Sequence, residues 1–280
     1  MKQMLSFFFA LCLLVQSPFS QDTKTVDAEL SRRLGDAELS MLFEGKSPVD
    51  AARWQRRFSE RLNGLLGPTT PPERWETVVE SQKLADHTRL RLTLKAEGAP
   101  DLPLYLLTPK GGGGEEPLGV VVAVHGHGDY GHHAVAGRRD MSGVAEAIEG
   151  ANYDYGLQFV RRSYVVACPC LIPFGDRVDR DKYKSDPCAV TFVRMMALGG
   201  VPIAENVRDI RWAVRFLQSR PEVDGERIGC AGLSYGGRMT MMATALEPRI
   251  KVAAVSGALN RCRSAAPFDP VTACRSSPRS

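Results

Sequence analysis

Four short runs of apolar residues without alternation constrain the fold of this 280-residue chain more than any other feature. They lie at residues 120–124, 164–167, 228–231 and 252–255. A strand covered on one face alternates apolar and polar side chains, so unbroken runs predict strands that are covered on both faces, as in a parallel sheet. We therefore expect an α/β fold.

Between these runs, apolar side chains recur at the three- and four-residue spacing of helices that bury one face. One such segment begins at Pro202, and another ends before Pro248. The apolar positions are Ile203, Val207, Ile210, Val214 and Leu217 in the first segment, and Met239, Met242, Ala243 and Leu246 in the second. Because strands and helices alternate, we predict a doubly wound, mostly parallel sheet.

The region ahead of these runs has a different pattern. Residues 90–94 alternate Leu with Arg and Thr, which predicts a half-buried strand, and residues 102–107 predict its partner. The four glycines at 111–114 are typical of a surface turn. A phosphate-binding loop is excluded there, because no Lys-Ser pair follows at the required spacing.

An N-terminal helical appendage precedes the strands. Ser47 stands before Pro48, which is a typical helix start, and Trp54 and Phe58 follow on one face before Gly67 ends the helix. We expect a helical segment with a linker over residues 21–75, the α/β core over 76–260 and an irregular tail over 261–280.

The first twenty residues have the layout of a secretory signal peptide. Lys2 is followed by an apolar stretch over residues 5–15, and Ser17 and Ser20 are small residues near a plausible cleavage point. We predict a signal peptide over residues 1–20, a secreted or periplasmic protein and no stable membrane insertion after cleavage. An uncleaved membrane anchor is the alternative.

The net charge and the cysteines limit which partners, metal sites and cysteine bonds we expect. The net charge is only +4 and no long basic run is present, so we expect no nucleic-acid partner. No Cys/His spacing matches a zinc site. Disulfides and buried free thiols remain alternatives for the six cysteines after the signal: Cys168, Cys170, Cys188, Cys230, Cys262 and Cys274.

A G-x-S-x-G motif marks a candidate nucleophile, Ser234. The motif glycines are Gly232 and Gly236, an apolar strand enters the motif, and an amphipathic helix leaves it. A nucleophilic serine at a sharp strand-to-helix turn needs nearly absent side chains two residues to either side. The alternative is a glycine-rich turn that contains a serine by chance.

A second motif, in residues 125–128, predicts an oxyanion hole. It follows directly on the strand ending at Val124 and includes Gly126 and Gly128, which would let a substrate carbonyl approach the backbone. In this architecture one amide comes from this loop and the other from the residue after the serine, so we predict the backbone N–H groups of His127 and Tyr235.

The same histidine-rich loop offers a metal site as the rival interpretation. His125, His127, His132 and His133 lack the regular spacing of a helical metal site, and Asp129 is the only acid nearby in sequence. We expect no metal, and no motif indicates a nucleotide or flavin cofactor.

These motifs together resemble secreted bacterial α/β-hydrolases of the dienelactone-hydrolase and acetyl xylan esterase type. The likeness runs from about residue 75 to 260 and rests on residues 125–128, 164–166, 174–177, 220–229 and 249–251 with the serine motif. It implies a serine hydrolase that acts on small-molecule or carbohydrate esters. Prolyl-oligopeptidase-like peptidases share this core, so a peptidase is the alternative.

Residues 174–177 follow a predicted strand near the expected site. Asp176 and Arg177 either shape a pocket there or pair with each other on a loop, and the pairing is the interpretation we favour.

The sequence after Ser234 departs from the family pattern, whose catalytic order is Ser, then Asp or Glu, then His. All five histidines precede Ser234, and the only later acids are Glu247 and Asp269. We therefore expect the last two strands to be missing and activity to be absent or weak. A frameshift or mis-assigned end after Asn260 is the hypothesis, and a non-catalytic, truncated gene product is the third functional alternative.

Overall fold

The computed structural model describes residues 25–84, 86–111, 116–178 and 186–258, so the predicted signal peptide, most of the glycine turn and the tail lie outside the described residues. The chain divides into two units. Within the described residues, one covers residues 25–40 and the other residues 41–258.

The first unit holds one helix, α1 (Val26–Asp36). The Thr25 side chain caps it by accepting a hydrogen bond from the Ala28 amide at 3.1 Å. None of its residues is buried, and its charged face is linked by ion pairs from Arg32 to Glu29 and Asp36.

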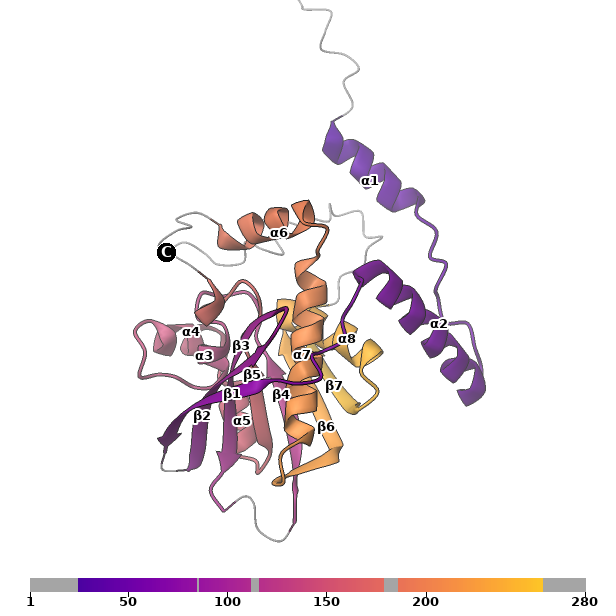
Figure 1. Cartoon of the computed structure of the whole chain (residues 1–280). Coiled ribbons are helices and arrows are strands. Elements are labelled where there is room, and N and C mark those ends of the chain that lie inside the picture. The colour runs from indigo at the N-terminus through magenta and orange to yellow at the C-terminus, as the bar shows by residue number, and fades with distance from the viewer. Residues whose placement is uncertain (1–24, 85, 112–115, 179–185, 259–280) are drawn as a thin grey trace, which may run out of the picture. The chain divides into compact units, whose positions relative to one another are not determined.

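The second unit is built on a seven-stranded mixed sheet (Figure 1) in the order β1-β2-β3-β5-β4-β6-β7. The strands are β1 (Glu76–Lys83), β2 (His87–Ala96), β3 (Ala99–Pro109), β4 (Leu118–Val124), β5 (Val165–Pro169), β6 (Val223–Leu233) and β7 (Ile250–Ser256). β1, β2, β3 and β5 pair antiparallel, whereas β5, β4, β6 and β7 pair parallel. The four apolar runs of the sequence are the four parallel strands.

Helices cover both faces of this sheet, which confirms the predicted doubly wound architecture. The helices of the second unit are α2 (Pro48–Leu66), α3 (His132–Val135), α4 (Val144–Ala151), α5 (Tyr155–Val160), α6 (Pro187–Ala197), α7 (Pro202–Gln218) and α8 (Tyr235–Leu246), with a 3₁₀ turn η1 (Gly175–Arg177). Side chains alternate between two cores. Val120, Val122 and Val124 of β4 pack in the core with α7 and α8, whereas Ala123 packs in the core with α3 and α5.

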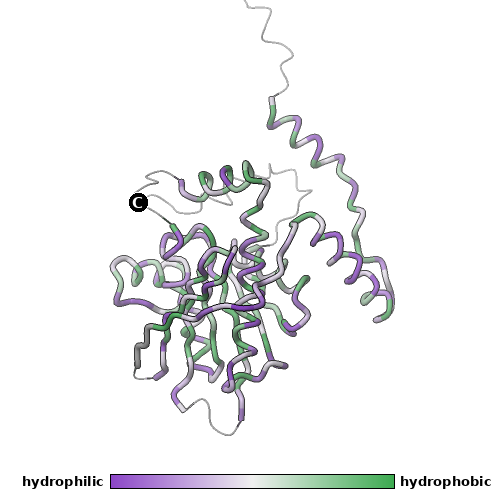
Figure 2. The backbone as a smooth tube through the Cα atoms, in the orientation of Figure 1, coloured by the Kyte–Doolittle hydropathy of each residue, from purple (hydrophilic) through white to green (hydrophobic). Residues whose placement is uncertain are grey.

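Helix α2 starts and ends where the sequence predicts. Ser47 caps it by accepting a hydrogen bond from the Asp50 amide at 3.1 Å, and Gly67 follows its last residue with φ +79°. Leu62 and Leu66 pack against the main core, and the Ser59 hydroxyl donates to the Ala245 carbonyl of α8 at 2.6 Å. The hydropathy of this helix accordingly alternates around its axis (Figure 2).

Strand β7 is the one apolar run whose burial was predicted wrongly. Five of its seven residues are exposed, and Val252 has 69% of its surface accessible. β7 pairs only with β6, at the end of the described sheet, and α8 is the described helix that packs against it. The unbroken apolar run therefore predicted the strand correctly, but it did not predict that most of β7 is exposed.

No described helix is by itself both long and apolar enough to cross a membrane. α6 and α7 together reach that length and composition, but they are bent by 98° at the break between them.

A buried leucine of the sheet and an exposed leucine of α2 should respond very differently to substitution by alanine. Leu106 of β3 is fully buried in the main core, so Leu106→Ala should lower the free energy of unfolding by about 2–5 kcal/mol. Leu65 of α2 is 65% exposed, so Leu65→Ala should change it by less than about 0.5 kcal/mol. Urea unfolding of the three proteins tests this, and equal losses in both variants would contradict the assigned core.

Candidate active site

Ser234 occupies a sharp turn between β6 and α8. Its backbone has φ 55° and ψ −115°, a conformation that costs a non-glycine residue free energy and persists only where its surroundings impose it. The Ser234 amide donates to the Ser256 carbonyl of β7 at 2.8 Å, and the Ser234 carbonyl accepts from the Arg238 amide at 3.1 Å. The turn is therefore held by the sheet on one side and by the helix on the other.

The motif glycines are required because backbone atoms approach them closely. A Cβ at Gly236 would lie 2.0 Å from the Val124 carbonyl oxygen, and one at Gly232 would lie 2.3 Å from the Gly236 carbonyl oxygen. A Cβ at Gly126 would lie 2.6 Å from the Leu233 carbonyl oxygen. These contacts press the serine turn against the loop that follows β4.

Gly128 has a different environment from the other motif glycines. A Cβ there would meet nothing within 4 Å. Gly128 instead has φ +157°, a backbone conformation that residues with a side chain rarely adopt, and its role beside a substrate stays a prediction.

His125 connects the ends of β4 and β5. Its ring is fully buried, Nε2 accepts a hydrogen bond from the Leu171 amide at 2.9 Å, and Nδ1 donates to the Gly126 carbonyl at 2.8 Å. Burial lowers the pKa of His125 to about 3, so the ring is neutral at neutral pH. Because both ring nitrogens are engaged in this way, His125 serves to fix the loop.

The next loop residues lie beside the helix start. The His127 ring packs 4.8 Å from the Tyr235 ring and 5.2 Å from the Phe174 ring, measured between centroids. Tyr235 is the first residue of α8, where backbone amides point out of the helix start. The structure thus brings both predicted oxyanion residues next to Ser234, and their role as donors stays a prediction.

Two residues that the sequence did not single out position this loop. The Tyr153 hydroxyl accepts from the Gly126 amide at 2.7 Å and donates to the His127 carbonyl at 3.4 Å. The fully buried Asn206 donates through Nδ2 to the Tyr235 hydroxyl and to the Ile172 carbonyl, both at 2.9 Å. The only available signal was a polar Asn among the inward-facing positions of α7.

No described residue forms a hydrogen bond with the Ser234 hydroxyl. Burial lowers the pKa of His127, and the nearby Arg238 lowers it further while Asp186 opposes the shift. The Nε2 atom of His127 lies 3.8 Å from the half-buried Cys188 thiol. Glu247, an acid that follows Ser234, is buried and paired with Arg249 at 2.6 Å and Arg211 at 3.3 Å, so it has a structural role.

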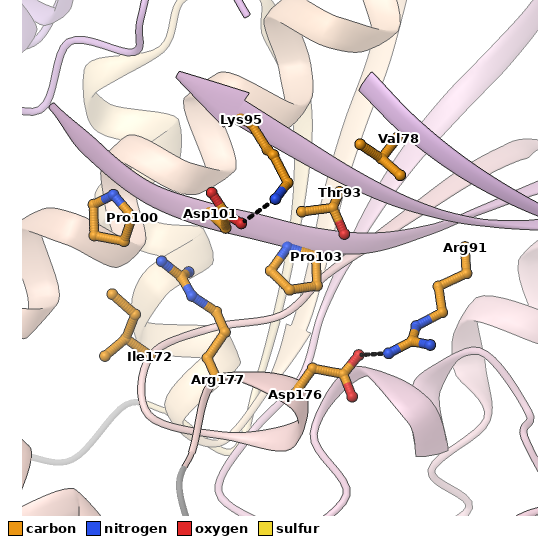
Figure 3. Close-up of a pocket in the computed structure, with 10 residues that line it drawn as sticks. All are labelled: Val78, Arg91, Thr93, Lys95, Pro100, Asp101, Pro103, Ile172, Asp176 and Arg177. Carbon is orange, nitrogen blue, oxygen red and sulfur yellow. Dashed lines mark hydrogen bonds and ion pairs between the residues drawn. The ribbon is translucent and has the colours of Figure 1, made fainter. Parts of the chain in front are cut away.

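The prediction that Asp176 and Arg177 pair with each other is wrong. Asp176 contacts His132, His133 and Arg91, whereas Arg177 pairs with the buried Asp209 of α7. The short η1 turn directs the two side chains to different partners. Figure 3 draws the ion pair of Asp176 with Arg91. Both also line a pocket of about 600 Å³ against β1–β3, which Ser234 does not line.

The histidine-rich loop is divided between two places. His125 and His127 lie on the Ser234 side, whereas His132 and His133 of α3 converge on Asp176. The four histidines that the sequence offered as a rival metal set therefore do not form one group.

Cys168, Cys170 and Cys230 are buried free thiols, one of the two predicted alternatives, and Cys188 forms no disulfide with another described cysteine. Burial raises the pKa of Cys170 and Cys230 to about 12 each. Cys262 and Cys274 lie outside the described residues.

Comparison with known proteins gives a consistent result. The profile of the Prolyl oligopeptidase family matches residues 204–259, the segment from α7 through β7. Among solved structures, a "putative acetyl xylan esterase" from Bacteroides fragilis NCTC 9343 superposes with a TM-score of 0.69 at 13% identity, covering 83% of this chain and 60% of that one. The chain has the α/β-hydrolase fold.

Two further relatives agree with this assignment. The "Putative hydrolase YtaP" of Bacillus subtilis (strain 168) is 33% identical over 207 residues, which are 71% of this chain and 62% of that protein. A glucuronoyl esterase from Solibacter usitatus superposes with a TM-score of 0.51 at 17% identity, covering 74% of this chain and 59% of that one. The chain thus spans about three fifths of the length of these relatives.

The close approach at the serine turn gives a direct test of the described geometry. Gly236→Ala should lower the free energy of unfolding by more than about 3 kcal/mol, because the Val124 carbonyl oxygen cannot move away without breaking the sheet. Gly150 lies in α4 with open space around it, so Gly150→Ala should instead stabilise the chain by up to about 1 kcal/mol. Chemical unfolding of both variants checks the contrast; a mild effect at Gly236 would refute the described turn.

The buried His125 predicts a pH dependence of stability. Its pKa falls from 6.5 to about 3 on folding, so only the unfolded chain binds the proton between these values. Stability should therefore decline as pH falls below 6.5, by up to about 1.4 kcal/mol per pH unit from this group. His125→Gln should remove that part of the slope when unfolding free energies are measured from neutral pH to about 5. Identical slopes in the two proteins would show that His125 does not carry it.

Proposed function

We propose that this chain is a serine hydrolase of the carboxylic-ester type with Ser234 as its nucleophile. The observation that carries the proposal is the strained backbone of Ser234, at φ 55° and ψ −115°. Such strain is rare outside functional sites, and here the packing at Gly126, Gly232 and Gly236 enforces it. Its place between a parallel strand and a helix start agrees with a nucleophile turn.

The proposed reaction is acyl transfer to Ser234. The Ser234 oxygen attacks the ester carbonyl carbon, the resulting oxyanion is stabilised by the backbone N–H groups of His127 and Tyr235, and the alcohol leaves with a proton. Water then cleaves the acyl-serine and releases the acid. The helix start at Tyr235 also favours negative charge beside the nucleophile.

We expect weak turnover from the chain of this sequence. No described histidine is hydrogen-bonded to the Ser234 hydroxyl, so nothing described takes up its proton as the bond forms. In a well-studied serine protease, loss of the histidine costs about a millionfold in turnover and leaves roughly a thousandfold over water. The same lack should slow removal of the acyl group, so an acyl-serine should accumulate.

Small-molecule or carbohydrate esters are the proposed substrates. The names of the solved relatives, an acetyl xylan esterase and a glucuronoyl esterase, support this class. A peptidase of the same core is the second candidate, and the match of residues 204–259 to the Prolyl oligopeptidase family favours it. Export to the periplasm or medium stays a prediction.

The test is hydrolysis of p-nitrophenyl acetate by the full chain, with an aminoacyl p-nitroanilide as the peptidase substrate. Because the half-buried thiol of Cys188 lies near the site and thiols also react with activated esters, two variants are needed. Ser234→Ala should reduce the rate to that of buffer, whereas Cys188→Ser should keep it. Mass spectrometry of the peptides should find the acetyl group on Ser234.

The controls make the outcomes decisive. Equal rates for the unchanged chain and folded Ser234→Ala protein, or acetyl groups found only on Cys188, would contradict Ser234 as the nucleophile. Release of p-nitroaniline that depends on Ser234, without release of p-nitrophenol above buffer, would favour the peptidase instead.

A further inference from the structure

Three side chains away from the serine turn converge as metal ligands do. Nε2 of His132 lies 3.2 Å from one carboxylate oxygen of Asp176, and Nε2 of His133 lies 3.1 Å from the other. One potential ligand atom from each residue lies within 4.8 Å of the other two. The histidines come from α3 and the aspartate from η1, so the group joins segments more than forty residues apart in the sequence.

The ring nitrogens of the buried His132 lack hydrogen-bond partners among the described residues. Its side chain is fully buried, yet neither ring nitrogen makes a hydrogen bond of acceptable angle to any described residue, despite the short distance to Asp176. Buried polar groups almost always have partners, and a bound ion would supply one to an imidazole that lacks them. The Gly175 backbone packs against Nδ1 of this ring, since an added Cβ would lie 2.8 Å from it, and Nε2 is the nitrogen that faces Asp176.

The distances suit a small divalent ion of the zinc class. Zinc binds imidazole nitrogen and carboxylate oxygen at about 2.0–2.2 Å, so two ligands at a tetrahedral angle lie about 3.3 Å apart. The separations of 3.1 and 3.2 Å between nitrogen and oxygen are close to that value. Two histidines and one carboxylate also form a ligand set that leaves a fourth position open.

The surroundings supply the supporting contacts that such ligands need. Nδ1 of His133 lies 2.9 Å from the Tyr105 hydroxyl, which the Arg138 guanidinium in turn contacts at 2.6 Å. A hydrogen bond on the far nitrogen fixes the orientation of a ligating imidazole. Arg91 donates to Oδ2 of Asp176 at 3.1 Å, which uses one of the two lone pairs of that oxygen and leaves the other for an ion.

We propose that His132, His133 and Asp176 bind one divalent ion of the zinc class, with a water molecule from the adjoining pocket as the fourth ligand. Asp176 lines that pocket and keeps 22% of its side chain exposed, which provides the entry path (Figure 3). The ion would fix η1 to α3 and so hold Phe174, whose ring contacts His127 and Tyr235. The ion takes no part in the bond changes proposed at Ser234, so metal binding can be measured separately from that reaction.

The test is metal binding by the full chain, prepared without a polyhistidine tag and stripped with a chelator. Titration with Zn²⁺ against a chromophoric competitor should give one equivalent per chain. The double variant His132→Gln/His133→Gln and the single variant Asp176→Asn should each bind more than tenfold more weakly. His87→Gln, which removes a histidine outside the proposed site, should keep the affinity of the unchanged chain.

A second measurement on the unchanged chain covers the case in which a variant does not fold. Co²⁺ should give visible bands of a nitrogen- and oxygen-ligated ion without the near-ultraviolet bands of thiolate ligation. Lack of binding, unchanged affinity in the folded ligand variants, or thiolate bands that assign the ion to cysteines would each overturn the proposal.

Discussion

The contact between the serine turn and the loop after β4 is the constraint on which the rest of the site depends. The Gly236 backbone packs so closely on the Val124 carbonyl that no side chain fits between them. This packing aligns the ends of β4 and β6, which pair in parallel up to Val124 and Gly232. The neutral His125 extends the same constraint to β5 through the Leu171 amide. Three strand ends are thereby fixed around Ser234 before any substrate is bound.

The parts of the fold set by local pattern could be predicted from the sequence. The start of α2 at Pro48, the span of α7 from Pro202 and the serine turn all depend on residues that are neighbours in the chain. Capping, apolar spacing and glycine requirements are local physical effects, so they can be read from a single sequence. The α/β architecture followed from these elements in order.

The parts that depend on distant partners could not be predicted in this way. Asp176 contacts His132 and His133, which lie more than forty residues away in the sequence, and Arg177 contacts Asp209. No sequence spacing predicts contacts between residues so far apart. The exposure of Val252 likewise depends on which elements lie beside β7. Its tendency to form a strand depends only on the residue type and its neighbours in the sequence. Tyr153 and Asn206 belong to no recognisable sequence motif, and their positioning role is evident only from their contacts at the site.

The glycine packing around Ser234 also determines which residues of this motif would be kept if catalysis were lost. Gly232 and Gly236 are needed for the chain to fold, because a Cβ at either one would clash with backbone. Ser234 is under a different requirement: its hydroxyl makes no hydrogen bond to a described residue, so the turn does not rely on it. A lineage that had lost catalysis would therefore still be selected to keep the glycines, while the serine drifted. Within this motif the glycines report on folding, whereas Ser234 reports on chemistry.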